Sequence, residues 1–379
     1  MKKFLTVLLV VLIWIVTFES VSWLAYSKLA PASGQKNISD LLNNNDKSFS
    51  TGTRTDQGLE SISEAEILPY YLYRNKPFSG IERQQINSEG YRNGTKEFGK
   101  KEKGKIRILA IGGSTTYGWL IKDYEQAWPA QLEAILNKKF NGQVEVINAG
   151  LPGGMSPELL VAFMLKDQYL DADIIIFHNG GNDAVPLFYK DYYPDYRYHR
   201  AINAAEKLRK GEKALIKNSH FFRLLYAFWL KDSSVSQSIR PEPEQKLSVQ
   251  ETAINVKKNQ PIGFERNMET MIKIAKEQKT EIVIFPFHLA RKEIYKIIPK
   301  DMRYTEKIHD SLQLGIEKNK AVLRALSKKY NLHYYEMPQD QIPLQYFFDH
   351  CHLTAQGDRM KAEFISKGVE EVIKKRISH

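Results

Sequence analysis

The feature that most constrains the fold is an alternation of short apolar runs with longer segments of helical periodicity, which starts at residue 106 and continues to the C-terminus. The apolar runs are typical of buried strands; they cover residues 106–111, 143–148, 173–178, 281–287 and 332–337. The helical patterns cover residues 127–140, 156–170, 261–278, 308–330 and 354–375. Strands that alternate with helices predict a doubly wound α/β fold, in which a parallel sheet is covered by helices on both faces.

The N-terminus predicts a membrane anchor. Lys2 and Lys3 precede an apolar run from Phe4 to Phe18, and a second apolar patch extends this run to Tyr26. A transmembrane helix needs about 20 mostly apolar residues, whereas a cleaved secretory signal needs an apolar core of about 7–15. The extended run favours an uncleaved single-pass anchor over residues 1–30, and secretion after cleavage is the alternative. Because the positive charges stay inside, the large C-terminal part is expected outside the cytoplasm in both cases.

The composition between the anchor and the alternating region indicates further divisions. Residues 31–66 are rich in Ser, Asn, Asp, Gly and Thr and predict a flexible stalk. We expect one domain over residues 67–379, with an aromatic, irregular lead-in over 67–105. The alternation is interrupted at 186–260, which we interpret as an insertion. Its apolar segment at 221–230 could pack in the core or contact a membrane or a partner protein.

Charge and cysteine content exclude several classes of function. The net charge is +11, but Lys and Arg are scattered among Glu and Asp, without a long basic block. We therefore expect no nucleic-acid partner. The single cysteine, Cys351, rules out an intramolecular disulfide and a cysteine-rich zinc site.

The residues that could perform chemistry follow the predicted strands, where sites form in open parallel sheets. Ser114 follows the first strand in GGSTTYG, Gly150 the second in NAGLPGG and Asn182 the third in HNGGNDA, while Asp349 and His352 lie in DHCH before the last helix. A serine hydroxyl becomes a strong nucleophile when a base accepts its proton, and His352 could be that base. Asp349 could hold the other imidazole nitrogen. The N–H groups of Ser114 and Gly150 and the side-chain amide of Asn182 could bind an oxyanion.

These four blocks resemble those of the SGNH (GDSL-type) hydrolase family, which is named for the Ser, Gly, Asn and His that they contain. The resemblance covers about Ile106 to the C-terminus and implies a flavodoxin-like sheet. It also implies an esterase or acyltransferase with a Ser–His–Asp triad and an oxyanion hole formed by Ser114, Gly150 and Asn182. The first block departs from the family pattern, because Gly113 stands where the family usually has Asp. That Asp is not a triad member, so we expect only the local hydrogen bonding to differ.

Each of these residues also has a structural interpretation. Ser114 could cap the following helix, and Asn182 and Asp183 could form a turn, with Asp183 the more structural of the two. The DHCH segment could bind a metal, but no second ligand group with suitable spacing accompanies it in the sequence, so we expect neither metal nor cofactor. His350 is an alternative base, but its spacing from the aspartate is poorer than that of His352.

The expected function is therefore an extracytoplasmic serine esterase that acts on O-acyl esters, above all O-acetyl esters, of a small molecule or a polysaccharide. An O-acetyltransferase with the same triad and a non-catalytic surface or assembly protein are the alternatives. The aromatic run at 188–199 could stack sugar rings or pack on its own domain. The predicted substrate contacts are Tyr117, Tyr189 and Tyr192. The membrane is the other predicted partner, through the N-terminal helix.

Overall fold

The computed structural model describes residues 2–31, 35, 38, 48–50, 64–66, 68, 70–79, 85–190, 192–197, 210–229 and 248–377. They belong to two units, Met1–Phe49 with Arg200–Pro241 and Ser50–His199 with Glu242–His379. Most of the predicted stalk lies outside the described residues; short strands are described there at β1 (Ser48–Ser50) and β2 (Glu64–Glu66).

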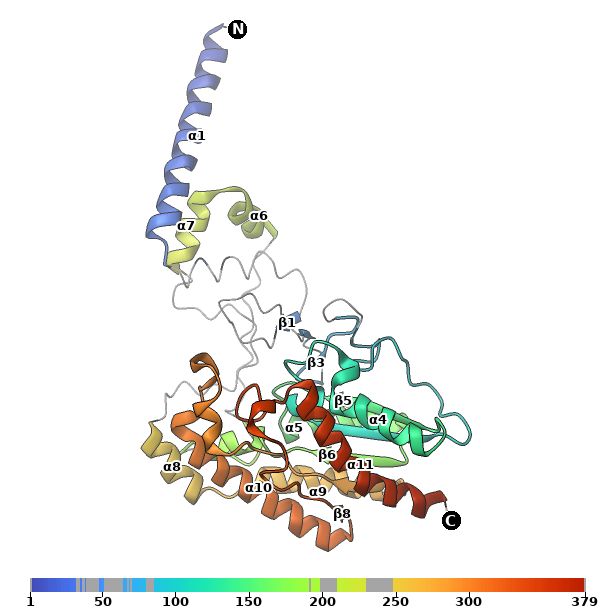
Figure 1. Cartoon of the computed structure of the whole chain (residues 1–379). Coiled ribbons are helices and arrows are strands. Elements are labelled where there is room, and N and C mark those ends of the chain that lie inside the picture. The colour runs from blue at the N-terminus through green and yellow to red at the C-terminus, as the bar shows by residue number, and fades with distance from the viewer. Residues whose placement is uncertain are drawn as a thin grey trace. The chain divides into compact units, whose positions relative to one another are not determined.

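Parallel strands form the main sheet of the larger unit (Figure 1). They are β4 (Ile106–Gly112), β5 (Val144–Gly150), β6 (Ile174–His178), β7 (Glu281–Ile284) and β8 (His333–Tyr334). Their spatial order, β5-β4-β6-β7-β8, is that of flavodoxin-like folds. The predicted doubly wound parallel sheet is thus confirmed. The last strand is shorter than predicted and pairs with β7 only at its two residues.

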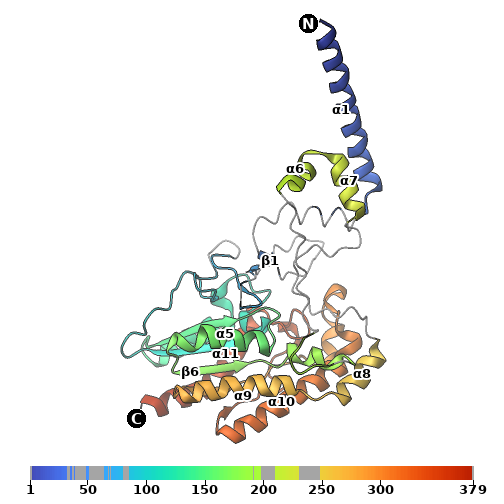
Figure 2. The same ribbon diagram turned by 180° about the vertical axis from the view of Figure 1, so that it is seen from behind.

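Helices cover both faces of this sheet (Figures 1 and 2). On one face α4 (Trp128–Lys139) packs against α11 (Ala355–Ile377). On the other lie α5 (Ser156–Leu165), α9 (Ile262–Glu277) and α10 (His309–Tyr330), with α8 (Val249–Lys258) packed on α10. Successive strand residues point to opposite faces, so Ile108 and Ile176 meet Trp128 of α4 in one apolar core. The remaining helices are short: α3 (Ser114–Tyr117), η1 (Tyr124–Gln126), η2 (Asp167–Leu170), η3 (Asn182–Phe188), η4 (Lys292–Lys296), η5 (Lys300–Met302), η6 (Glu306–Ile308) and η7 (Leu344–Tyr346).

The described part of the lead-in contacts strand β5 and the loop that follows it. The lead-in contains β3 (Arg74–Asn75), which pairs antiparallel with β2. Asn75 Nδ2 donates to the Gly150 carbonyl at 3.0 Å, and the Tyr73 hydroxyl donates to the Pro152 carbonyl at 2.8 Å. These side chains give the carboxyl end of β5 a fixed position.

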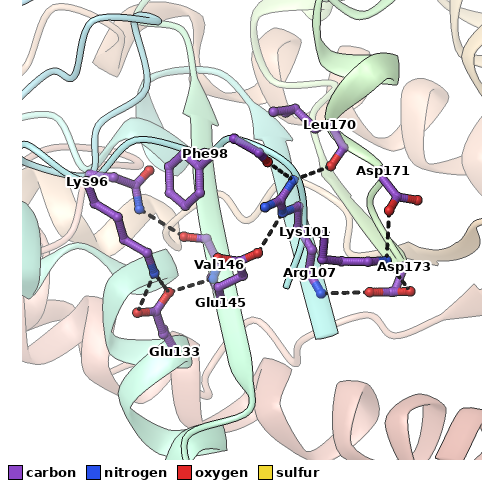
Figure 3. Close-up of polar contacts among 12 residues, drawn as sticks. Lys96, Phe98, Lys101, Arg107, Glu133, Glu145, Val146, Leu170, Asp171 and Asp173 are labelled. Atoms are coloured by element: carbon purple, nitrogen blue, oxygen red, sulfur yellow. Dashed lines mark hydrogen bonds and ion pairs between the residues drawn. The ribbon is translucent and has the colours of Figure 1, made fainter. Parts of the chain in front are cut away.

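A buried arginine at the start of β4 is held by several polar partners (Figure 3). Arg107 Nε donates to Glu145 Oε1 at 2.6 Å across the β4–β5 pair, and its Nη1 donates to the Leu170 carbonyl at 2.6 Å. Its backbone N–H donates to Asp173 Oδ2 at 2.8 Å. A buried charge is costly unless it is paired. This network therefore allows a charged residue at the end of the sheet opposite to the Gly-rich loops.

The smaller unit contains the predicted anchor. Helix α1 (Lys2–Leu29) includes the span Leu9–Leu29, the only one among the described residues that is long and apolar enough to cross a membrane. Two helices from the predicted insertion, α6 (Lys210–Asn218) and α7 (His220–Trp229), belong to the same unit, and α7 packs against α1.

Candidate active site

Ser114 is separated by one residue from strand β4, which is flanked by β5 and β6, and is the first residue of α3. The turn depends on Gly112, because a Cβ there would lie 2.2 Å from Thr116 Oγ1 and 2.3 Å from the His178 carbonyl oxygen. Only a glycine permits this close approach. The chain therefore turns sharply at the end of the strand and exposes the Ser114 hydroxyl at the edge of the sheet.

Asp349 and His352 lie in the loop between η7 and α11. The ends of this loop are joined by an antiparallel bridge between Phe347 and Leu353, and the Phe348 N–H donates to the His352 carbonyl at 2.8 Å. The Asp349 side chain is completely buried. The loop thus presents the aspartate and the histidine from a fixed backbone.

The three predicted catalytic side chains form one chain of hydrogen bonds. His352 Nε2 lies 2.8 Å from Ser114 Oγ, and His352 Nδ1 lies 2.7 Å from Asp349 Oδ2. An ionised carboxylate only accepts hydrogen bonds, so Nδ1 carries the proton and Nε2 is left to accept from the serine hydroxyl. This is the arrangement that general-base activation of a serine requires.

The surroundings of Asp349 favour its ionised form. Burial alone would raise the pKa of this carboxyl, but the charge and hydrogen bonds of His352 outweigh burial and hold the pKa well below its usual range. Oδ1 also accepts the backbone N–H groups of Cys351 at 2.8 Å and His352 at 2.7 Å. Asp349 is therefore a charged partner for the imidazole at any pH near neutrality.

His350, the alternative base, does not occupy the same position. Its Nδ1 is 3.9 Å from Asp349 Oδ1 and makes no hydrogen bond. Burial lowers its pKa to about 4 in spite of the nearby carboxylate, so it is neutral near pH 7. The serine hydroxyl is bonded to His352 and not to His350.

Two aromatic residues that the sequence did not single out contact the triad. The Tyr304 hydroxyl donates to Asp349 Oδ2 at 3.0 Å, so this oxygen accepts from both Tyr304 and His352. The indole ring of Trp119 packs against the His352 imidazole, with 4.7 Å between ring centroids. Both residues restrict the orientation of the aspartate–histidine pair.

A buried arginine from the lead-in supports the segment that follows Ser114. The Arg92 guanidinium has no exposed surface and donates to the carbonyls of Tyr117 and Gly118 at 2.7 Å each. It also donates to the Ile121 carbonyl and to the side-chain oxygen of Gln85. The lead-in therefore takes part in shaping the turn behind the serine.

Of the predicted oxyanion donors, Asn182 lies next to the serine turn. A Cβ at Gly113 would be 3.0 Å from Asn182 Nδ2, and the same nitrogen donates to the Gly154 carbonyl at 2.8 Å. A primary amide has two N–H donors, so the bond to Gly154 fixes the amide and leaves the second N–H for another acceptor.

Gly150, predicted as an oxyanion donor, has its backbone N–H bonded elsewhere in this structure. Its N–H donates to Asn148 Oδ1 at 3.0 Å and is already used inside strand β5. A Cβ at Gly150 would lie 2.2 Å from the Tyr117 backbone nitrogen. The glycine is therefore needed for close packing of β5 against α3, and not as a donor to substrate.

The three tyrosines predicted to contact substrate have different surroundings. Tyr117 is completely buried, with the Arg92 guanidinium 4.4 Å from its ring centroid, so it presents no surface to a substrate. Tyr189 and Tyr192 are half-buried against the apolar cluster around η3 and α10. The Tyr192 hydroxyl accepts the Gly263 N–H at 3.0 Å. The structure gives none of the three a position against the triad.

Asp183 has a structural environment, as the sequence favoured. Its carboxylate accepts the Ser156 hydroxyl at 2.6 Å and the Tyr196 hydroxyl at 2.7 Å. Burial raises its pKa to about 6. These bonds join η3 to the start of α5.

Among the described residues, the side chains of Asp349, Cys351 and His352 form the cluster that could hold a metal, with ligand atoms within 4.8 Å of one another. The thiol would have to lose its proton to bind a metal, and burial raises the pKa of Cys351 well above its usual value. The carboxylate is already bonded to the imidazole and two backbone N–H groups. The residues therefore suit proton transfer better than metal binding.

A comparison with protein-family models decides the family. The model of the GDSL-like lipase/acylhydrolase family matches residues 110–360, which is more than half of the chain and includes Ser114 and His352. The chain belongs to this family. Membership of the GDSL-like family confirms the resemblance seen in the four sequence blocks and identifies the chain as an enzyme of the esterase and acylhydrolase class.

Solved structures similar to this GDSL-like protein are distant in sequence. An acetyl xylan esterase is 15% identical and matches over 70% of this chain and 100% of its own, with a TM-score of 0.39. A lipase/acylhydrolase from Enterococcus faecalis is 15% identical over 70% and 96% of the two chains, with a TM-score of 0.39. A mutant acetyl-xylooligosaccharide esterase from Geobacillus Stearmophilus is 12% identical over 71% and 96%, with a TM-score of 0.41. A search of curated proteins finds no match.

Proposed function

We propose that this protein is an extracytoplasmic serine esterase that removes O-acetyl groups from a carbohydrate polymer. The observation that carries the proposal is the hydrogen bond of 2.8 Å between Ser114 Oγ and His352 Nε2, continued from His352 to a buried carboxylate. Membership of the GDSL-like family supports the ester chemistry.

The proposed reaction has two steps. Ser114 Oγ attacks the ester carbonyl carbon while His352 Nε2 accepts its proton, and Asp349 stabilises the imidazolium that forms. The tetrahedral oxyanion accepts hydrogen bonds from the Ser114 N–H and the side-chain amide of Asn182. The carbon–oxygen bond to the alcohol then breaks, and His352 returns the proton to the leaving alkoxide. In the second step His352 deprotonates a water that attacks the carbonyl carbon of the acyl-serine. The bond from that carbon to Ser114 Oγ then breaks, His352 returns the proton to Oγ, and acetic acid leaves and ionises to acetate.

The choice of a carbohydrate rests on an aromatic surface beside the triad. The hydroxyl of Tyr304 is bonded to Asp349, but 56% of the residue is exposed. An exposed ring at the triad can stack on the apolar face of a sugar while its polar end stays hydrogen-bonded. This surface replaces the three tyrosines predicted from the sequence.

The extracytoplasmic location rests on the N-terminal helix. The span Leu9–Leu29 has the length of a membrane helix, and Lys2 and Lys3 precede it. We divide the chain into an anchor at 1–30, a stalk at 31–66 and a hydrolase domain at 67–379 that carries the insertion. A protease added to intact cells is expected to cut this chain between the anchor and the hydrolase domain. Protection of the whole chain in intact cells, with cleavage only after lysis, would contradict the location.

The test of the chemistry is hydrolysis of p-nitrophenyl acetate by the full-length protein in detergent. Ser114→Ala is expected to lower kcat by about 10³-fold or more, because it removes the nucleophile. Ser88→Ala, at an exposed serine of the lead-in, is the matched control and should keep the wild-type rate. Turnover that does not depend on Ser114 would refute the proposal and favour a non-catalytic role.

The small acyl group and the polymer are tested separately. Hydrolysis should be faster for acetyl than for long-chain p-nitrophenyl esters, and acetate should be released from acetylated polysaccharides. A preference for long chains would overturn the acetyl assignment while leaving the serine mechanism in place. Transfer of the acetyl group to a sugar hydroxyl instead of water would reassign the protein as an acetyltransferase.

A further inference from the structure

We propose that the α6–α7 hairpin of the insertion is a second membrane-embedded element, which inserts into the outer leaflet beside α1 and is covered by lipid. The inference rests on the proposed anchor and extends it, because the sequence left open whether the segment at 221–230 packs in the core or contacts a membrane or a partner protein. It concerns the smaller unit alone and is independent of the esterase chemistry.

One face of helix α1 is covered by helix α7. Ser22 of α1 and Ala30, the residue directly after this helix, are buried, whereas Trp23 and Leu24 on the other sides of the helix are more than half exposed. Ala30 shares an apolar cluster with Ala227 of α7. Small side chains such as these allow two helices to approach closely, as they do in membranes.

The turn between α6 and α7 is joined to α1 and to α6 by several hydrogen bonds within the unit. Glu19 of α1 accepts the Ser219 hydroxyl and also the His220 N–H, the latter at 2.7 Å. Arg223 Nε donates to the Ile216 carbonyl at 2.8 Å, and Nη2 donates to the Lys217 carbonyl at 2.7 Å. Inside a bilayer, irregular backbone and charged side chains are tolerated only where such partners exist. Glu19 and Arg223 meet this requirement, whereas His220 Nδ1 is buried without a hydrogen bond. Lys217 is exposed, and its long side chain can extend towards the headgroups.

The depth of that turn follows from the position of Glu19. Glu19 stands 10 residues before the outer end of the span Leu9–Leu29, about 15 Å at a rise of about 1.5 Å per residue. On its other side the apolar run continues back to Phe4, so Glu19 lies on the outer side of the midpoint of this run. Helix α7 has 10 residues and therefore a length of about 15 Å. It starts beside Glu19, and Figure 1 shows it alongside the C-terminal half of α1. Its length therefore covers the part of α1 between Glu19 and the outer end of the span.

The exposed side of the hairpin is apolar and suits contact with lipid. Leu225 and Phe228 of α7 are 49% and 47% exposed, and Leu215 of α6 is 47% exposed. These side chains continue the exposed apolar surface of α1, which the anchor already assigns to lipid. A groove of about 650 Å³ runs along the junction. It is lined by Ile15, Val16, Glu19, Ser20, Trp23, Leu24 and His220, an apolar wall with a polar end that suits a lipid chain.

The experiment places a fluorescent label at single positions of the full-length protein in phosphatidylcholine and phosphatidylglycerol vesicles. Leu225→Cys and Phe228→Cys report on the hairpin, and Trp14→Cys reports on the anchor. Tyr169→Cys, at a residue that is 74% exposed in the larger unit, is the control for water. Cys351 is buried and stays in place, and the unsubstituted protein measures its background labelling. Quenching is measured with iodide from water and with doxyl groups on the lipid chains.

We expect labels at positions 225 and 228 to be quenched several-fold less by iodide than the label at 169, and to be quenched by doxyl lipid. If iodide reaches the labels at 225 and 228 while the label at 14 is shielded, the membrane insertion of the hairpin is refuted and the anchor is retained. If iodide reaches the labels at 14, 225 and 228, both the membrane anchor and the insertion of the hairpin are refuted. Shielding from iodide without doxyl quenching would contradict a lipid occupant and point to a second copy of the chain.

A second variant tests the turn in the same vesicles. Glu19→Ala removes the acceptor of the Ser219 hydroxyl and the His220 N–H, so the label at 225 should become several-fold more accessible to iodide while the label at 14 stays shielded. Unchanged accessibility at 225 would contradict the role given to Glu19 in holding the hairpin.

Discussion

At the residue scale the proposed chemistry depends on His352. Its two ring nitrogens face Ser114 Oγ and Asp349 Oδ2, which is the position that a general base for this serine requires. We predict that His352→Ala lowers kcat by about 10³-fold or more in the p-nitrophenyl acetate assay. His333→Ala, at the half-exposed end of β8, is the control and should stay near the wild-type rate. A variant of His352 with an unchanged rate would remove this residue from the mechanism.

Tyr304 is a positioning residue that shares Asp349 Oδ2 with the imidazole. A hydrogen bond to a charged group contributes about 1.5–3 kcal/mol, so we predict that Tyr304→Phe lowers kcat by about tenfold. Because the carboxylate then accepts one donor fewer, the acid limb of the kcat/KM profile should move to higher pH. The comparison is with Tyr70→Phe, at a residue that is 91% exposed. A purely structural role would lower stability but leave the pH profile where it is.

Sequence order was enough to find Ser114, Asp349 and His352 as candidates, because each follows or precedes a clear periodic element. Sequence order could not show which backbone groups point towards the site. It therefore predicted Gly150 as an oxyanion donor, although the Gly150 N–H is bonded to Asn148 Oδ1. The contact of Tyr304 with Asp349 spans 45 positions and starts from an irregular segment. No local pattern marks such a contact.

At the element scale the lead-in supports the turn after Ser114 through Arg92. We predict that Arg92→Lys lowers kcat/KM by about 10–100-fold, because one ammonium group cannot bond all of the carbonyls that the guanidinium holds and the serine is displaced. The melting temperature should fall as well. Lys96→Ala, which removes an exposed ion pair with Glu133, should change both little. Equal effects of the two substitutions would contradict the supporting role of Arg92.

The elements themselves were largely predictable. The helical and strand periodicities gave the parallel sheet, and the Gly-rich loops marked the carboxyl ends of β4, β5 and β6. The partner of the apolar segment at 221–230 was not predictable, because periodicity shows an apolar face without showing what covers it. The structure pairs this segment with α1, more than 190 positions away in sequence, through contacts such as Phe18–Phe221.

At the scale of the whole molecule, buried histidines predict a loss of stability in acid. Burial lowers the pKa of His178 well below 6.5, that of His288 to about 3 and that of His350 to about 4. The unfolded chain binds protons at these residues below about pH 6.5 while the folded chain does not, so stability is lost as pH falls from about 6.5 towards 4. Burial raises the pKa of Asp183 and Asp358 to about 6. The folded chain binds protons at these two carboxyls before the unfolded chain does, so they increase stability as pH falls over part of the same range. They are fewer than the three histidines, so the net effect is a loss of stability.

We therefore predict that the free energy of unfolding in detergent decreases between pH 6.5 and pH 4. His288→Phe should reduce the slope by up to one proton, about 1.4 kcal/mol per pH unit. The substituted ring can keep the stacking on Phe347, whose centroid is 6.0 Å away. An identical slope in the variant and the wild type would show that His288 is not responsible for the acid loss.

The most direct test of the central claim is covalent labelling of the intact protein with an alkyl fluorophosphonate, followed by peptide mass spectrometry. This reagent reacts with a serine whose proton is taken by a base. We predict one adduct, on Ser114, that is lost in Ser114→Ala and formed far more slowly in His352→Ala. An adduct on another residue, or equally fast labelling of Ser114 in the absence of the His352 imidazole, would contradict the account.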